Sequence, residues 1–542
     1  MTEIKSILYS KDKKPNRVNQ ALVVAVFTCL IIAYLFNASY YYTDNPGVLG
    51  DNYLHMHKMM KEGLYVKLHH MSFPLLSDML VNTFISTGII QPTDPLFLEK
   101  CYKLSILPTG LLNVLALGLF FIFLLRANTP PLKAVLIFLT LSTSYTFWMW
   151  AIQNNSIGMA LAWQVLISLY FYYWWQHHTL SHTVLFTLAC CLSMFFHIGL
   201  VYFAIGTYLV MQGRILYLSK GKIKNCYKKL LLSNGMALTL GMAFIYVGMG
   251  LTETNTLSGL FDVLADKEYL KNLPPDNRNI FAKLIEQTQR GRFNQISYYY
   301  ELFYPGWIVA RIPTGADITQ MTIQKIGHIA LGVLGASILI YPKTTYKNGI
   351  KPFIFTGAVT SAISIVGFAI HPQSSHHYYA VAYVPYFLLF FGFIIPEREK
   401  RVEWGQQVLM IIIIALTVYY NVFSPLNIFR GKDLDYHPFY VQNSLINIHT
   451  KTKPAVFFNE LDVGYYPNYS LDEYYRKKFG HIIWRSDTLL WNTQEKILSE
   501  LENYTSSDTL NVYIGEKAKT LLTGDTIYTY IKIENNLWEL QK

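Results

Sequence analysis

The chain has 542 residues, of which 52% are hydrophobic and 15% are charged, and its formal net charge is +11 at pH 7. A typical soluble chain has about 25% charged residues, so this composition lacks the charge of an ordinary water-facing surface. The excess of basic residues does not indicate a nucleic-acid partner. These residues form short clusters between apolar runs, as at 11–14 and 220–229, which is the positive-inside pattern of membrane proteins.

The cysteines and the amino terminus exclude two further classes. Of the five cysteines, none has the spacing of a metal ligand set, and no disulfide framework is indicated. The first apolar run, 21–36, lacks a small-residue cleavage site and is therefore predicted to be a signal anchor rather than a cleaved signal peptide.

Eleven apolar runs approach the length of about 20 residues that a membrane-spanning helix needs. They are 21–37, 104–125, 134–152, 157–175, 183–197, 198–212, 231–250, 326–342, 353–370, 379–396 and 407–423. The pair within 183–212 is ambiguous, because these nearly uncharged residues fit either one tilted helix or two short ones that turn at 197–199.

Loop charge favours the two-helix interpretation. If the basic amino terminus, 1–20, is cytoplasmic, the basic segments 126–133, 214–229, 343–351 and 397–401 are all cytoplasmic only when the chain crosses eleven times. We therefore predict a polytopic α-helical membrane protein whose transmembrane module covers 21–423. A bacterial inner membrane is the expected location, and the large loops 38–103 and 251–325 then face the periplasm or an equivalent lumen.

The tail, 424–542, has the pattern of a small soluble α/β domain on the same outer side. Apolar runs at 455–458, 482–484 and 512–514 predict strands, and 493–504 predicts a helix between the last two. Residues 527–533 and 536–540 predict a closing hairpin. The tail has no Gly-rich phosphate loop, so a cap or recognition module is expected rather than the active centre.

The first outer loop contains the residues best suited to chemistry. Asp51 follows the first apolar run by about a dozen residues. After it, Tyr53, His57 and Lys61 recur at intervals of four and share one side of a predicted amphipathic helix. A carboxylate in this position suits a general base, and nearby cations suit the phosphate of an anionic lipid.

The order of residues in this loop resembles that of GT-C glycosyltransferases, specifically the branch that contains protein mannosyltransferases and the lipid A aminoarabinose transferase (glycosyltransferase 39/83-like). That branch has an Asp, a Tyr, a helix ending in Gly, a second Tyr and a basic-Pro-Pro-Leu turn. The corresponding residues here are Asp51, Tyr53, Gly63, Tyr65 and the predicted turn Phe73-Pro74-Leu75, preceded by His69 and His70. The segment from His376-His377 to Pro385 resembles a later His/Arg-Tyr…Pro element.

The resemblance has three departures. Phe73 replaces the first proline, the basic residue is displaced to His70, and the next outer turn, Gln153-Asn154-Asn155-Ser156, lacks the second acid that several branches have. The resemblance also extends to the architecture, since the family combines a multi-span module with juxtamembrane helices in the first outer loop and an outer carboxy-terminal domain.

The resemblance implies an inverting transferase of the cell envelope. It would move a sugar from a polyprenyl-phosphate donor to a hydroxyl of a glycan, lipid or protein acceptor, in contact with membrane lipids and without nucleic acid. Asp51 would be the base, and Tyr53, Tyr65 and Glu301 would bind the sugar or acceptor. The expected donor-phosphate ligands are Lys58, Lys61, Lys67, His69, His70, Arg311, His376 and His377.

The site shows one carboxylate, so no cofactor is assigned and we expect at most weak dependence on a divalent cation. A Mg²⁺ or Mn²⁺ site is kept as an alternative, because Asp262, Asp266 or Glu301 could approach Asp51 in the fold.

Other readings remain open. An acid just outside a span is most often a solvated boundary residue. His69, His70, His376 and His377 also suit a membrane interface. A transporter would show internal repeats and intramembrane charges, but the chain has no evident repeat and almost no intramembrane charge. An O-antigen polymerase or ligase remains an alternative because of Arg290, Arg292 and Arg311. A non-enzymatic scaffold would not need the pattern around Asp51.

Overall fold

The computed structural model describes the helical part of the chain in long segments and the tail in short ones. The described segments are 17–40, 72–91, 97–126, 130–144, 156–196, 200–251, 400–419, 455–458, 482–485, 511–515, 529–534 and 537–541, with isolated residues between them. The predicted spans 326–342, 353–370 and 379–396 lie outside these segments, apart from isolated helical residues such as Leu334.

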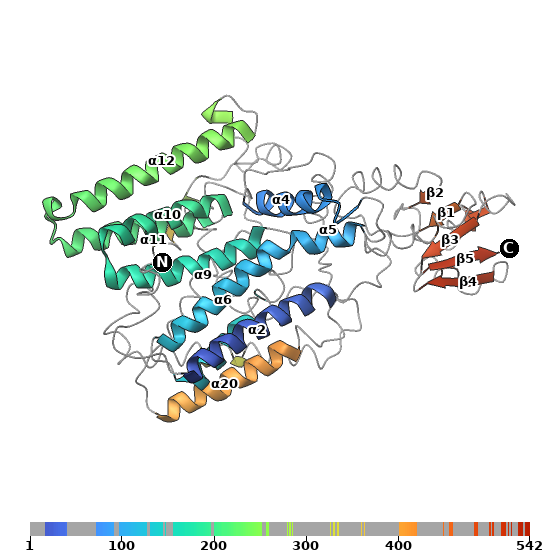
Figure 1. Ribbon diagram of the computed structural model, residues 1–542, viewed down its shortest axis with the longest axis horizontal. Helices are drawn as coiled ribbons and strands as arrows, with labels where there is room; N and C mark the ends of the chain where they lie inside the picture. Colours follow the sequence, from blue (N-terminus) through green and yellow to red (C-terminus); the bar gives the residue numbers. More distant parts are fainter. Residues whose placement is uncertain are drawn as a thin grey trace.

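Most of the described residues are helical (Figure 1). The longer helices are α2 (Arg17–Tyr40), α6 (Leu107–Arg126), α7 (Pro131–Ser142), α9 (Ser156–His177), α10 (Leu180–Phe196), α11 (Leu200–Leu218), α12 (Tyr227–Leu251) and α20 (Lys400–Val418). Two shorter helices, α4 (Ser72–Ser86) and α5 (Phe97–Ser105), precede α6. Among the described residues, two apolar helical stretches, Lys103–Arg126 and Tyr227–Gly250, are long enough to cross a membrane.

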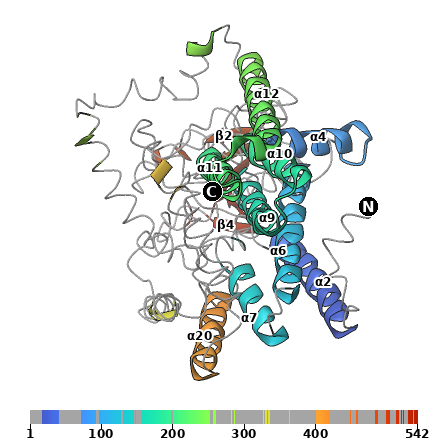
Figure 2. The ribbon, with the colours of Figure 1, turned by 90° about the vertical axis from the view of Figure 1, so that its left-hand side faces the viewer.

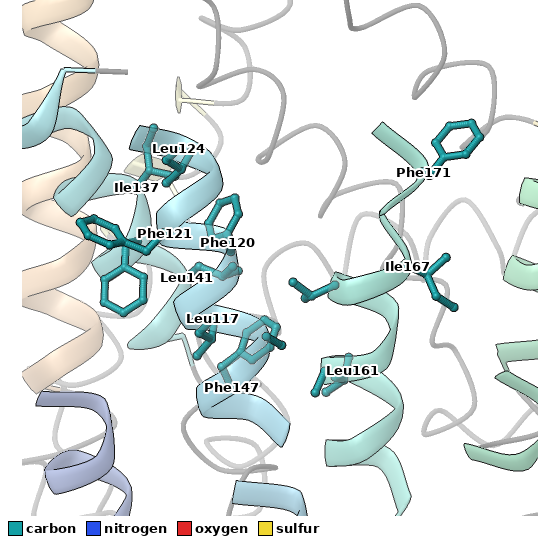
Figure 3. Packing of buried hydrophobic residues seen from close by; sticks show 14 of the residues in the cluster. Leu117, Phe120, Phe121, Leu124, Ile137, Leu141, Phe147, Leu161, Ile167 and Phe171 are labelled. Atoms are coloured by element: carbon teal, nitrogen blue, oxygen red, sulfur yellow. The ribbon is translucent and has the colours of Figure 1, made fainter. Parts of the chain in front are cut away.

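The core lies where α6 packs against α9 on one side and α7 on the other (Figure 3). Leu117, Phe120 and Phe121 of α6 are at most 1% exposed. The Phe121 ring meets Phe138 of α7 edge to face, with centroids 5.3 Å apart. Large side chains from three helices therefore interdigitate around α6, and dispersion contacts of this kind are individually weak but collectively large.

At the junction of α2 and α6, a glycine allows close helix packing. A Cβ atom at Gly118 would lie 2.1 Å from Cζ of Phe27 and 2.3 Å from Cε1 of the same ring. The ring thus occupies the space that any other residue would fill. Small residues at helix–helix contacts have this role in membrane bundles, where packing rather than water exclusion holds helices together.

Helix α7 ends earlier than the sequence predicts. The apolar run predicted a span over 134–152, but α7 ends at Ser142. The hydroxyl groups of Thr143 and Ser144 donate hydrogen bonds to the carbonyl oxygens of Leu139 and Leu141, at 2.8 and 2.6 Å. Consecutive Ser and Thr side chains satisfy the final carbonyls of the helix and compete with its continuation. The prediction of the helix end was wrong because it weighed hydropathy alone.

The ambiguous segment 183–212 forms two helices, α10 and α11, as loop charge predicted. Helix α10 is also fixed to α9 near both of its ends. Trp163 of α9 donates from Nε1 to Ser193 Oγ at 3.2 Å, and Trp174 donates from Nε1 to Thr183 Oγ1 at 3.0 Å. Trp163 also stacks on Phe196, with centroids 4.5 Å apart. The α9–α10 pair is therefore an antiparallel hairpin with polar contacts at its two ends.

The end of α11 has the hydrogen bonds of a Schellman motif. Gly221 N donates to Leu216 O at 3.1 Å, and Lys220 N donates to Tyr217 O at 3.0 Å. Lys220 occupies the left-handed position with φ of 54°, where glycine is the usual residue because it has no Cβ. A short 3₁₀ turn, Ile223–Asn225, then leads to α12.

The described part of the tail forms a five-stranded mixed sheet in the order β2-β1-β3-β5-β4. Its strands are β1 (Ala455–Phe458), β2 (Ile482–Arg485), β3 (Asn511–Gly515), β4 (Thr529–Glu534) and β5 (Leu537–Gln541). Strand β1 is parallel to β2 and β3, while β5 is antiparallel to β3 and β4. All three predicted strands and the hairpin are confirmed. Their assignment to a separate outer domain over 424–542 stays a prediction.

The helix predicted at 493–504 is described at four helical residues, of which Leu501 is fully buried beside Val456, Val512 and Ile514 of the sheet. Figure 2, which looks along the helices from the end opposite the sheet, shows α7 beside α20 and α12 beside α10. The contact between α7 and α20 joins segments that are far apart in the chain, since α20 begins more than 250 residues after α7.

The close approach at Gly118 gives a stability prediction. Gly118→Ala should lower the free energy of unfolding by about 1–3 kcal/mol, because the new methyl group forces the Phe27 ring out of its place. The measurement is the thermal-unfolding midpoint of the detergent-purified chain. In a Phe27→Ala background the ring is absent, and the same substitution should then cost little.

Gly241→Ala in α12 is the matched control. A Cβ at Gly241 meets nothing within 4 Å, and alanine favours the helix over glycine by up to about 1 kcal/mol. This variant should be neutral or slightly stabilised. Equal loss of stability for Gly118→Ala with and without the Phe27 ring would contradict the packing account.

Candidate functional site

The residues that the sequence assigns to the site lie outside the described part of the chain. This holds for the predicted base, Asp51, and for every proposed ligand of the donor or acceptor: Tyr53, Lys58, Lys61, Tyr65, Lys67, His69, His70, Glu301, Arg311, His376 and His377. Their roles and their mutual distances remain predictions. The described residues give the frame to which the first outer loop is attached.

Two helices fix the ends of the segment that carries Asp51. Helix α2 ends at Tyr40, and α4 begins at Ser72. Helix α2 packs on α6, whereas α4 packs on α5, α6, α9 and α10. The intervening residues 41–71 therefore start and finish on elements that share the α6 surface. In Figure 1, α4, α5 and the end of α2 all lie toward the side of the molecule where the sheet is drawn.

The prediction of a turn at Phe73-Pro74-Leu75 is wrong, because these residues belong to the beginning of helix α4. Proline is compatible with this position, because the first amide groups of a helix have no partner inside the helix. The correction has a chemical consequence. The amino-terminal end of a 15-residue helix directly follows His69 and His70 in the chain, and unpaired N–H groups at such an end favour negative charge.

Sequence reasoning missed a buried carboxylate on the same helix. Asp78 has 0% exposure, and it is the one acid in the buried set among residues whose exposure the structure describes. Its neighbour Ser77, also fully buried, donates a hydrogen bond to Ser105 O of α5 at 2.9 Å. The signal available in the sequence was a single acid in an otherwise apolar helix. Burying a charge is costly unless it is paired.

A polar contact joins α6 to the start of α9. Asn113 is 1% exposed, and its Nδ2 donates to Thr109 O at 2.9 Å and to Gly158 O at 3.1 Å. The bond to Gly158 supplies a donor for a backbone carbonyl of the neighbouring helix. The Thr109 hydroxyl is buried without a hydrogen-bond partner among the described residues. This end of the α6–α9 pair thus has both a satisfied amide and an unsatisfied hydroxyl.

The described residues contain no group of three or more His, Cys, Asp or Glu side chains that could hold a metal ion. Asp262 and Asp266, like Asp51 and Glu301, fall outside that part of the chain. The predicted weak metal dependence is therefore untested.

The chain was compared with known protein families and with curated proteins. No family model matches it, and no curated protein matches it.

Proposed function

We propose that this chain is a multi-pass membrane glycosyltransferase of the GT-C type. It transfers a sugar from a polyprenyl-phosphate donor to a hydroxyl group of a glycan, lipid or protein acceptor at the outer face of a bacterial inner membrane. The single observation that carries the proposal is the order Asp51, Tyr53, Gly63, Tyr65, Phe73-Pro74-Leu75 directly after the first apolar helix.

The arrangement of helices around this motif supports the proposal. The motif begins 11 residues after the end of α2 and finishes inside α4. Helix α4 lies within the loop 38–103 and α5 begins in it, as expected of a GT-C enzyme with helices in its first outer loop. The apolar α6 follows them at once and is buried against five other elements. A loop between two packed helices can hold reacting groups in fixed positions.

The chemistry needs one base and a site for a leaving phosphate. The acceptor oxygen attacks the anomeric carbon from the side opposite the donor phosphate, and its proton passes to Asp51. The bond between the anomeric carbon and the phosphate oxygen breaks, and the electron pair leaves with the polyprenyl phosphate. Attack from the opposite side inverts the anomeric configuration. Lys67, His70 and Arg311 are assigned to the phosphate because its charge increases as the bond breaks.

The proposed orientation places Lys220 and Lys347 in the cytoplasm and Glu62, Arg290 and Asp487 outside. Single cysteines at these five positions, in a chain without the native cysteines, should show this in intact cells. A membrane-impermeant maleimide should label the three outer sites directly. It should label the two lysine sites only after permeabilisation. Labelling of position 487 only in permeabilised cells would contradict the eleven-span orientation.

The catalytic assignment predicts that Asp51→Asn lowers kcat by about 10²-fold or more, because the amide keeps the size of the side chain but cannot take the proton. The measurement is release of polyprenyl phosphate by the purified enzyme from a panel of polyprenyl-phosphate sugars. The thermal-unfolding midpoint should not change. Parental turnover by Asp51→Asn would show that the assigned role is wrong.

Three further substitutions separate the base from other groups. Lys67→Ala and His70→Ala should raise KM more than they lower kcat, since they weaken donor binding. Asp78→Asn replaces the buried carboxyl group of α4 by an amide and should lower the unfolding midpoint. If Asp78→Asn abolishes turnover at an unchanged midpoint, the catalytic carboxylate belongs to α4 and not to the loop.

A further inference from the structure

A basic and aromatic cluster lies where α9, α10, α11 and α12 meet, at the end of these helices that the topology places in the cytoplasm. We define the Arg214 cluster as Trp175, His178, Arg214, Tyr217 and Lys229. Arg214 of α11 reaches the Trp175 ring of α9, with Cζ 4.5 Å from the ring centroid, and lies 5.7 Å from the centroid of Tyr217. Rings hold a guanidinium by its faces, while its N–H groups point outward in the plane.

A second cation joins the cluster from another helix. Lys229 of α12 donates a hydrogen bond from Nζ to the backbone oxygen of His178, in the link between α9 and α10. The pKa of His178 lies below the usual value of histidine because burial disfavours its charged form and because Lys229 and Arg214 repel a further proton.

One polar atom of the cluster is buried and unsatisfied. Arg214 Nε has no hydrogen-bond partner among the described residues. Buried polar atoms in folded proteins normally have a partner, and an unsatisfied one calls for an explanation. A ligand with several acceptor oxygens is the group that would complete the guanidinium.

The sequence supplies no acid that could neutralise the cluster from its own helices. Between Glu99 and Glu253 the chain contains no Asp or Glu at all. The same stretch contains these Lys and Arg residues: Lys100, Lys103, Arg126, Lys133, Arg214, Lys220, Lys222, Lys224, Lys228 and Lys229. Six of these ten lie within 214–229, so the charge is concentrated at the end of the helices where the cluster is found.

Lys220 adds a separate indication. Its left-handed backbone costs a residue with a Cβ about 1–2 kcal/mol, and the C′ position of a Schellman motif is normally glycine. The chain thus retains a cation at a position where glycine would be more stable. Strain of this kind is typically found at functional positions.

The surroundings of the cations favour an amphipathic ligand over a free anion. Large apolar or aromatic side chains beside them are exposed: Tyr217 by 74%, Ile223 by 63% and Leu231 by 69%. Tyr170, Tyr173 and His182 add further rings at this end of α9 and α10, with a hydrogen bond of 3.1 Å between Tyr170 Oη and His182 Nδ1. Tyrosine and tryptophan are enriched where a membrane meets water.

We propose that the Arg214 cluster binds the phosphate group of an anionic membrane lipid, with phosphatidylglycerol as the chemical type, and that the exposed apolar side chains contact its acyl chains. Basic pockets between helices at the cytoplasmic surface suit such headgroups. The inference depends on the membrane location of the chain but not on the transferase reaction. A binding measurement therefore tests it independently of Asp51.

The test titrates phosphatidylglycerol or phosphatidylcholine into the full chain, purified in a neutral detergent, and follows the thermal-unfolding midpoint. Phosphatidylglycerol should raise the midpoint of the parent, and phosphatidylcholine should not. Arg214→Gln should increase the half-maximal phosphatidylglycerol concentration by about tenfold, the effect of losing a charge-assisted hydrogen bond.

Lys220→Gly keeps the test valid if Arg214→Gln does not fold. Glycine relieves the left-handed strain, so the lipid-free midpoint should rise, while the half-maximal lipid concentration should increase about fivefold through loss of one surface cation. The variant should thus gain stability and lose lipid affinity, a combination that a merely structural lysine would not produce. Lys532→Gln in β4 removes the same charge at a distant site and should leave lipid binding unchanged.

Three results would overturn the proposal. The first is an equal response to the two lipids. The second is a loss of binding in Lys532→Gln as large as in Arg214→Gln, which would indicate net charge alone. The third is a midpoint shift with inorganic phosphate that matches the shift with phosphatidylglycerol, which would indicate a site for a soluble anion.

Discussion

The packing of α6 is the constraint on which the rest of the helical part depends. This one helix contacts α2, α4, α5, α7 and α9, so its surface sets how these five elements are placed around it. The kind of contact differs from one neighbouring helix to the next. Gly118 accommodates the Phe27 ring of α2, Phe121 packs its ring edge on α7, and Asn113 donates a hydrogen bond to the α9 backbone. A change in the rotation of α6 would disturb all three contacts at once.

The polar side chains inside these helices are mostly satisfied without leaving their own helix. Thr140, Thr187 and Thr207 are almost fully buried, and each hydroxyl donates to the carbonyl oxygen four residues earlier, at 2.8, 2.9 and 2.6 Å. This arrangement suits an environment that offers no water, because no hydroxyl needs an external partner. The contacts that do cross between helices are few and specific, such as Gln212 to Ser233 and Tyr208 to Asn234 between α11 and α12.

The helices and strands were largely predictable because long apolar runs and alternating patterns are local signals. Loop charge alone was enough to predict that 183–212 is two helices, since only an even number of crossings there kept every basic loop on one side. The end of α7 was not predictable from hydropathy, because it depends on hydroxyl groups that bond to backbone carbonyls. The first turn of α4 was also mispredicted. The resemblance implies a turn at Phe73-Pro74-Leu75, although a helix tolerates proline at its start.

The candidate site was predictable only as an order of residues. Its chemistry depends on which side chains converge from loops that are hundreds of residues apart, such as those carrying Asp51 and His376, and sequence spacing does not encode that distance. Asp78 is a second example. The sequence shows it as the single acid of the apolar helix α4, but its complete burial is visible only in the structure.

The absence of acids between Glu99 and Glu253 has a consequence for proton binding. The stretch contains four histidines, and the fold shifts the pKa of one of them, His178. The pKa of His178 is lower in the folded chain than in the unfolded chain, so the unfolded chain binds more protons just below the usual histidine pKa. The contribution of His178 to stability is therefore full above that pKa and is lost as the pH falls through the interval between its unfolded and folded values. The stretch itself therefore contributes no carboxylate to acid unfolding.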